Sequence, residues 1–228
     1  MNPWFARFIA WFLERVGKGT LLILLLALAL AGSLGAGLAE AARGPSSGLL
    51  VSAGFAALLL GWVLARSRLP GLPAWATLVA VGLLFLLVRV GRLGGELLRL
   101  IVELNDWVSG LLRWAPGLSP PGAEALRLTW TDAWSQASDL GIRLLSWSVD
   151  LANRRAAFDP VSASLVWGLV AWIAAAWLAW GLRRWERPLL AACIPAGTLV
   201  SVLSLTGETS YLLLVALAAT FSLAAAHR

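Results

Sequence analysis

The sequence predicts an all-α integral membrane protein. A helix rises about 1.5 Å per residue, so roughly 20 residues cross a hydrocarbon core of about 30 Å. Charged residues make up only 13% of the chain, whereas soluble domains contain about 25%. Six stretches without a charged residue are long enough, or nearly so, to cross a bilayer: Gly19–Ala39, Gly44–Ala65, Leu69–Val88, Pro160–Leu182, Pro188–Gly207 and Thr209–Ala226. We therefore expect about six transmembrane helices in two groups of three.

These spans divide the chain into three segments. Residues 1–88 hold an N-terminal segment and the first three spans, residues 89–159 form a connector, and residues 160–228 hold the last three spans. Basic residues concentrate in the short cytoplasmic loops of membrane proteins. With the N-terminus inside, the short outer loops hold only Arg43, and the inner segments hold nine basic residues: Arg7, Arg15, Lys18, Arg66, Arg68, Arg183, Arg184, Arg187 and Arg228.

Four arginines near the span ends of the connector count against this orientation: Arg89, Arg92, Arg154 and Arg155. The asymmetry of the short loops still favours a cytoplasmic N-terminus and C-terminus. We therefore expect the connector to lie on the outer side of the membrane.

Tryptophan supports the span limits. The chain has 14 tryptophans, and six of them fall where an amphipathic ring would meet lipid headgroups, namely Trp4, Trp11, Trp62, Trp75, Trp180 and Trp185. Three others, Trp167, Trp172 and Trp177, lie deeper in the fourth span. We expect these three to pack between helices or to face lipid.

The first half of the connector carries a stripe of charged residues that indicates one helix. Its charges recur at steps of three and four, as on one face of a helix. Arg92 with Glu96, and Arg99 with Glu103, are i,i+4 pairs of opposite charge that support a helix modestly. This candidate interaction stripe consists of Arg89, Arg92, Glu96, Arg99, Glu103 and Asp106.

Apolar residues fill the remaining surface of this predicted helix. Such a helix is expected to lie in the membrane interface with its charged stripe toward water, and a partial dip into the membrane also fits the pattern. The stripe is either a solvated face or a surface that docks a partner or lipid headgroups. The proline-rich segment Pro116–Gly122 then ends the helix.

A second amphipathic helix is predicted in the other half of the connector. Apolar residues recur at steps of three and four from Leu126 to Leu151. Asp159 then suits the N-cap of the fourth span, and Pro160 suits its first turn. The polar face of the second helix carries Asp132, Gln136, Asp139, Arg143, Ser146 and Asp150.

The residues of enzymes and metal sites are scarce. His227 and Cys193 are the only histidine and cysteine, 34 positions apart, and a metal site needs several converging ligands. Glu208 is a polar hairpin tip or, as the alternative, a functional carboxylate. The basic residues form no dense patch of the kind that binds phosphate backbones. We expect no catalytic residue, cofactor, metal or nucleic-acid partner.

The last part of the chain resembles a known family. The matching segments read FDPVSASLVWGL at 158–169, WGLRRWERPLLA at 180–191, IPAG at 194–197 and TGETSYLLL at 206–214. They are similar to the N-terminal multi-pass membrane region of bacterial transglutaminase-like membrane proteins. In that family, a bundle of helices precedes an extracytoplasmic transglutaminase-like domain with a Cys–His–Asp triad. The Trp-rich stretch Trp130–Trp147 looks like the family's connector.

The resemblance implies a function without catalysis in this chain. Nothing here matches the catalytic domain, so no catalytic residue is carried over. The expected function is a membrane anchor or scaffold, in a bacterial plasma membrane, for an extracytoplasmic transglutaminase-like activity in cis or in trans. The chain would then be either a truncated membrane region or a stand-alone relative. The alternative is a membrane subunit of a transporter or of a lipid or polysaccharide export system, and the pattern leaves substrate and oligomeric state open.

Overall fold

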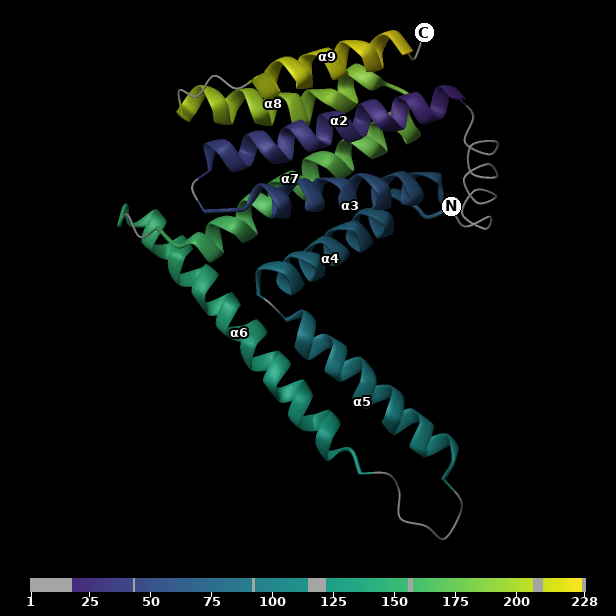
Figure 1. The fold of residues 1–228 in the computed structure, drawn as a ribbon, viewed down its shortest axis with the longest axis vertical. Coiled ribbons are helices and arrows are strands. Elements are labelled where there is room, and N and C mark those ends of the chain that lie inside the picture. Colours follow the sequence, from purple (N-terminus) through teal and green to yellow (C-terminus); the bar gives the residue numbers. More distant parts are fainter. Residues whose placement is uncertain are drawn as a thin grey trace, which may run out of the picture. The chain divides into compact units, whose positions relative to one another are not determined.

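A computed structural model describes residues 18–42, 44–91, 93–114, 122–155, 158–206 and 211–226. Within these ranges every regular element is a helix (Figure 1). In chain order they are α2 (Lys18–Ala41), α3 (Ser47–Arg66), α4 (Gly71–Val90), α5 (Gly94–Leu112), α6 (Glu124–Ala152), α7 (Pro160–Trp180), the π-helical turn η1 (Gly181–Trp185), α8 (Pro188–Thr206) and α9 (Tyr211–Ala226). The predicted all-α class is confirmed.

Five of these helices are long and apolar enough to cross a membrane: α2, α3, α4, α7 with η1, and α8. The predicted sixth span corresponds to α9, which is equally apolar but has 16 residues. Large apolar side chains stand exposed on the spans, for example Leu59, Val63 and Leu72. Such surfaces are typical of helices that face lipid. The chain is therefore a helical membrane protein with at least five candidate spans among the described residues.

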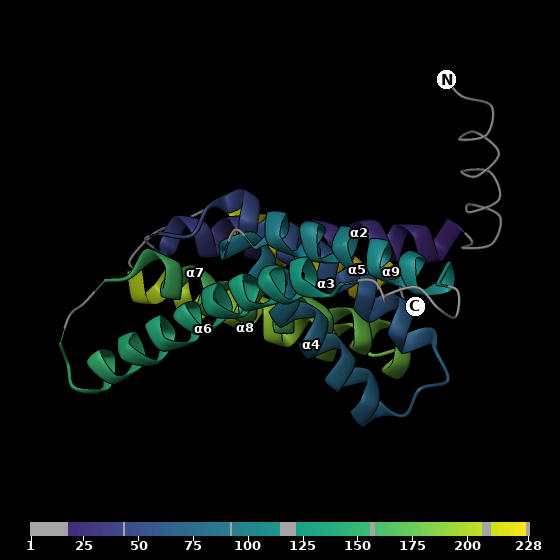
Figure 2. The same cartoon turned by 90° about the horizontal axis from the view of Figure 1, so that it is seen from below.

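The chain forms two compact units. One contains Met1–Gly82 and Trp167–Arg228, and the other contains Leu83–Val166. In the first unit, α2 packs against α3, α8 and α9, and α8 packs against α9 (Figures 1 and 2). In the second unit, α5 packs against α6.

Small residues let the backbones of α2 and α3 approach closely. A Cβ atom added to Gly35 of α2 would lie 2.8 Å from the backbone nitrogen of Val51 and 2.9 Å from the carbonyl oxygen of Leu50. From the α3 side, a Cβ atom on Gly54 would lie 3.3 Å from the carbonyl oxygen of Ala31. Since lipid tails are as apolar as leucine, close packing of this kind is a main source of helix association in membranes.

Trp172 joins α7 to α4 in the same unit. Its side chain is 1% exposed, and its indole Nε1 donates a hydrogen bond of 3.0 Å to the carbonyl oxygen of Leu78. The ring occupies space that Gly82 leaves open, since a Cβ atom there would lie 2.5 Å from Nε1. Of the two expectations for this tryptophan, packing between helices is therefore confirmed.

Aromatic and basic side chains gather where α7 continues into η1. Trp75 lies 5.9 Å from Trp180 and 6.3 Å from Trp177, measured between ring centroids. The guanidinium of Arg184 lies 5.1 Å from the Trp180 ring centroid, a cation–π distance. The expectation that Trp180 meets headgroups is wrong, because this cluster covers it and leaves it 3% exposed.

The contact at Gly35 generates a prediction. Replacing Gly35 with alanine should lower the unfolding temperature in detergent, because overpacking against a rigid backbone costs about 1–3 kcal/mol. Gly197→Ala on α8 is the matched control, since a Cβ atom there meets nothing within 4 Å and helix propensity favours alanine by about 1 kcal/mol. Tryptophan fluorescence during heating measures both variants. Equal unfolding temperatures would contradict the close α2–α3 contact.

Candidate interaction surface on the α5–α6 hairpin

The α5–α6 hairpin of the second unit has an unusually open surface. Neither α5 nor α6 contains a buried residue. Large apolar side chains stand exposed on both helices, including Leu98 and Ile101 on α5 and Ile142 and Leu145 on α6. Exposed apolar surface is typical of regions that contact a protein partner or lipid.

The structure corrects the first half of the candidate interaction stripe. Arg89 belongs to the last turn of α4, and the chain bends at Gly91 before α5 begins at Gly94. A Cβ atom at Gly91 would lie 2.5 Å from the backbone carbonyl oxygen of Leu87, which cannot move aside, so the bend requires glycine; the flexible end of the Leu140 side chain of α6 fills the same space. The prediction of one helix that carries the whole stripe from Arg89 to Asp106 is therefore wrong. The three-and-four spacing of the charges continues across the bend, although the helix does not.

The second half of the stripe lies on one helix. Glu96, Arg99, Glu103 and Asp106 are all on α5, and each is at least partly exposed. Arg99 pairs with Glu96 at 3.3 Å, an i,i+3 contact, rather than with Glu103 as predicted. An exposed pair of this type contributes little to stability, so these charges are available to a partner. Arg92 lies outside the described residues, and so does its predicted pair with Glu96.

The second predicted amphipathic helix is confirmed as α6, which is slightly longer than the expected Leu126–Leu151.

The hairpin from residue 94 to residue 152 holds seven acidic and four basic residues, a formal charge of −3, although the whole chain carries +6. Its acidic residues are Glu96, Glu103, Asp106, Glu124, Asp132, Asp139 and Asp150. The hairpin is thus an acidic element of a basic protein.

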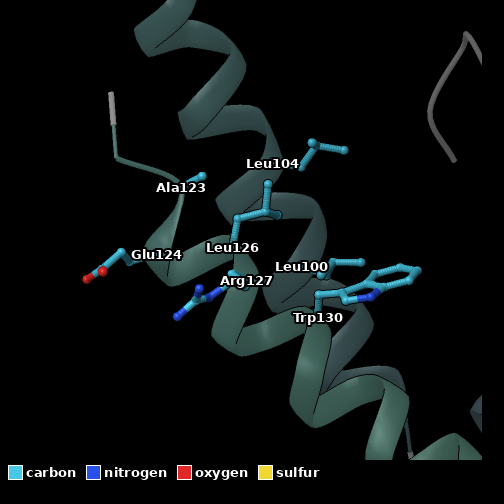
Figure 3. A pocket seen from close by; sticks show the side chains of 7 residues that line it. All are labelled: Leu100, Leu104, Ala123, Glu124, Leu126, Arg127 and Trp130. Carbon is cyan, nitrogen blue, oxygen red and sulfur yellow. The ribbon is translucent and has the colours of Figure 1, made fainter. Parts of the chain in front are cut away.

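An apolar groove runs between the two helices of the hairpin. Its volume is about 600 Å³, and it is lined by Leu100 and Leu104 of α5 and by Ala123, Glu124, Leu126, Arg127 and Trp130 of α6 (Figure 3). A smaller apolar cavity of about 140 Å³ shares Leu100 and Trp130 with the groove. Its remaining lining residues are Leu84, Leu87, Leu93, Leu97, Ala133, Trp134 and Ala137.

Asp159 links α6 to the start of α7. Its carboxylate caps α7 by accepting hydrogen bonds from the backbone nitrogen of Ser162 at 3.0 Å and of Val161 at 3.4 Å, as the sequence predicts for an N-cap. It also pairs with Arg143 of α6, whose Nε and Nη2 donate at 2.9 and 2.5 Å. This bidentate pair ties α6 to the first turn of α7. Sequence reasoning placed Arg143 only on a polar face, because no local signal connects residues 16 positions apart.

The pair sets the charge state of Asp159. Partial burial alone would raise the pKa of this carboxyl, but hydrogen bonds from Arg143, from the Ser162 side chain and from the backbone of Ser162 and Val161 lower the pKa from 3.8 to about 2. Asp159 therefore stays ionised across the physiological pH range and keeps both its cap and its ion pair.

Of the remaining chemical candidates of the sequence, the structure describes only Cys193. Cys193 is exposed on α8, and His227 and Glu208 lie outside the described residues. The described part of the chain contains no group of three or more histidine, cysteine, aspartate or glutamate side chains placed to hold a metal ion.

Comparisons with known proteins add no relative: no protein-family model, curated protein or solved structure matches the chain.

The Asp159 cap generates a prediction that separates its two roles. Asp159→Ala should lower stability at pH 7 by about 1–2 kcal/mol, since it removes the N-cap and the ion pair, whereas Asp159→Asn should lose less because asparagine also caps helices. A lowered carboxyl pKa contributes stability that is complete above the unfolded-state pKa and is lost as pH falls toward the folded-state value.

Wild-type protein should therefore lose this contribution between about pH 4 and pH 2, the interval between the unfolded and folded pKa values of Asp159. Asp159→Asn should lose less over the same interval. Unfolding temperatures of the three proteins at a series of pH values measure the difference. Parallel pH profiles for wild type and Asp159→Asn would show that the Arg143 pair contributes nothing.

Proposed function

We propose that this chain is a non-catalytic membrane scaffold whose α5–α6 hairpin docks an extracytoplasmic partner. The observation that carries the proposal is the open hairpin itself, whose helices have no buried residue and present a charged row beside exposed apolar side chains. The resemblance of residues 158–228 selects the partner class, a transglutaminase-like domain in cis or in trans. The hairpin charge of −3 fits a partner whose contact surface is basic.

The interior of the spans supports a scaffold over the alternative of a transporter or export subunit. Transport paths and intramembrane catalysis use ionisable groups inside the membrane. The buried polar side chains of the described residues are Ser33, Ser162 and Ser164. Ser33 and Ser164 donate to carbonyl oxygens of their own helices, at 2.9 and 2.6 Å, and Ser162 donates to Asp159. These hydroxyls serve local structure, and none of them is directed at a path between helices.

We also propose six spans in a bacterial plasma membrane, with α9 as the sixth, both termini in the cytoplasm and the hairpin outside. Support comes from the arginines of two loops that are far apart in sequence. Arg184 Nη1 donates to the carbonyl oxygen of Leu69 at 3.4 Å, and the Arg183 guanidinium lies 5.7 Å from the Trp62 ring centroid. The basic loop after α3 and the basic turn η1 therefore lie at the same end of the first unit, as one cytoplasmic face requires.

Docking can be tested on the part of the candidate interaction stripe that lies on α5. A transglutaminase-like domain co-expressed with this protein should co-purify with it in detergent. Replacing both Glu103 and Asp106 with lysine should reduce recovery of the domain by about ten-fold, because charge complementarity at the contact is reversed. The matched control replaces Asp132 and Asp139 of α6 with lysine, which changes the net charge equally on another face. The proposal would be contradicted if the domain were recovered equally with the wild type, with both double variants and with membranes that lack the protein.

The orientation can be tested by cysteine labelling in intact cells. In a Cys193→Ser background, Ser135→Cys on α6 should react with a membrane-impermeant maleimide added outside, whereas Arg68→Cys between α3 and α4 should react only after the membrane is opened. Both positions are exposed. The reverse pattern would place the hairpin in the cytoplasm and exclude an extracytoplasmic partner.

A further inference from the structure

We propose that the apolar groove between α5 and α6 binds one acyl chain of a zwitterionic phospholipid with an ethanolamine-type headgroup, held at Glu124 and Arg127. This site goes beyond the docking function, because it uses a different face of α5 and does not depend on which protein partner binds the hairpin.

The lining of the groove matches an amphiphile. Leu100, Leu104, Leu126 and Trp130 provide apolar side chains, and the volume of about 600 Å³ lies within the range of about 300–1,000 Å³ that is common for small-molecule sites. Figure 3 shows the two charged residues, Glu124 and Arg127, on one side of the groove, with Leu100, Leu104 and Trp130 on the other. The site therefore has a charged edge and an apolar interior.

The apolar interior continues toward the membrane span. The smaller cavity shares Leu100 and Trp130 with the groove and is lined at its other side by Leu84 and Leu87 of α4. These two leucines belong to a helix that is long and apolar enough to cross the bilayer. The two cavities share a wall, so apolar side chains line the surface from the candidate span α4 to the charged edge at Arg127. A phospholipid has the same order of apolar and charged parts as this lining, with its acyl chains toward the bilayer and its charged headgroup away from it.

The charges at the edge favour a zwitterion over an anion. A guanidinium such as that of Arg127 binds phosphate oxygens through several donors, and the Glu124 carboxylate can accept hydrogen bonds from a primary ammonium group. An anionic headgroup would meet Glu124 and the formal charge of −3 on the hairpin, which repel it. A choline headgroup has no N–H donor for the carboxylate, so ethanolamine lipids fit best.

The tryptophans of α6 support lipid as the occupant. Trp130 and Trp134 stack with ring centroids 6.5 Å apart and are 57% and 65% exposed. Exposed tryptophans of this kind concentrate at the level of lipid headgroups. The hairpin also follows a candidate span directly in the chain, since α4 ends only four residues before α5 begins.

The experiment uses the full chain in nanodiscs that contain a small fraction of phospholipid with a photoactivatable group on one acyl chain. Phosphatidylethanolamine, phosphatidylglycerol and phosphatidylcholine probes with the same chain are compared, and labelled peptides are mapped by mass spectrometry. The ethanolamine probe should label the peptides that contain Leu100, Leu104 and Trp130, and the other two probes should label them several-fold less. Labelling of Leu59 on α3, which is exposed, serves as the internal reference for ordinary lipid contact.

Matched variants test the groove and its edge separately. Ala123→Phe fills the groove and should lower labelling by the ethanolamine probe about ten-fold, while Ala125→Phe, on the same helix but outside the groove, should leave it unchanged. Glu124→Gln and Arg127→Gln should remove the preference among headgroups, while Arg113→Gln should keep it. Equal labelling of wild type and Ala123→Phe, relative to Leu59, would overturn the groove as a lipid site. Equal labelling of the wild-type protein by all three probes would overturn the ethanolamine assignment.

Discussion

The absence of hydrogen-bonding partners in hydrocarbon is the constraint on which the rest of this structure depends. A span must satisfy its backbone and hydroxyl groups within its own helix, and the hydroxyls of Thr77, Thr198 and Thr220 each donate to the carbonyl oxygen four residues earlier at 2.8 Å. The outer surfaces of the spans are then mainly apolar, and hydroxyls that are at least partly exposed, such as those of Thr77 and Thr198, are bonded within their own helices. The size of the side chains, rather than their polarity, distinguishes the face of a span that packs against another helix from the face toward lipid. For this reason glycine and alanine occupy the α2–α3 contact.

The same constraint moves ionisable groups out of the spans and gives each a local partner or an interfacial position. Arg184 is exposed at one end of the first unit, where its guanidinium lies at a cation–π distance from the Trp180 ring. In the second unit, Arg143 and Asp159 neutralise each other at the start of α7. The hairpin keeps a net acidic charge of −3 over residues 94–152, although the whole chain is basic.

Features decided by neighbouring residues could be predicted from sequence, and features decided by tertiary contact could not. The limits of α3, α6 and α8 follow from the local pattern of apolar residues, and the Asp159 cap needs only the three residues that follow it. By contrast, the contact of Leu140 with Gly91 and the Trp172 bond to Leu78 join residues 49 and 94 positions apart. The charge periodicity around Arg89 was misleading because a spacing of three and four residues can continue across a bend. The spacing alone therefore does not show where a helix ends. The groove was missed because each of its walls is an ordinary amphipathic helix.

The surface of α5 explains how one short helix can serve both proposed ligands. At 100° per residue, Leu100 and Leu104 fall on the side that faces α6, whereas Arg99, Glu103 and Asp106 fall on an adjacent side. A lipid chain in the groove would fill space beside α6 and hold the two helices in one arrangement, and the charged row would remain open. A lipid that restricted the motion of α5 relative to α6 would lower the entropic cost of docking a protein partner. Lipid binding would then favour docking without any contact between the lipid and the partner.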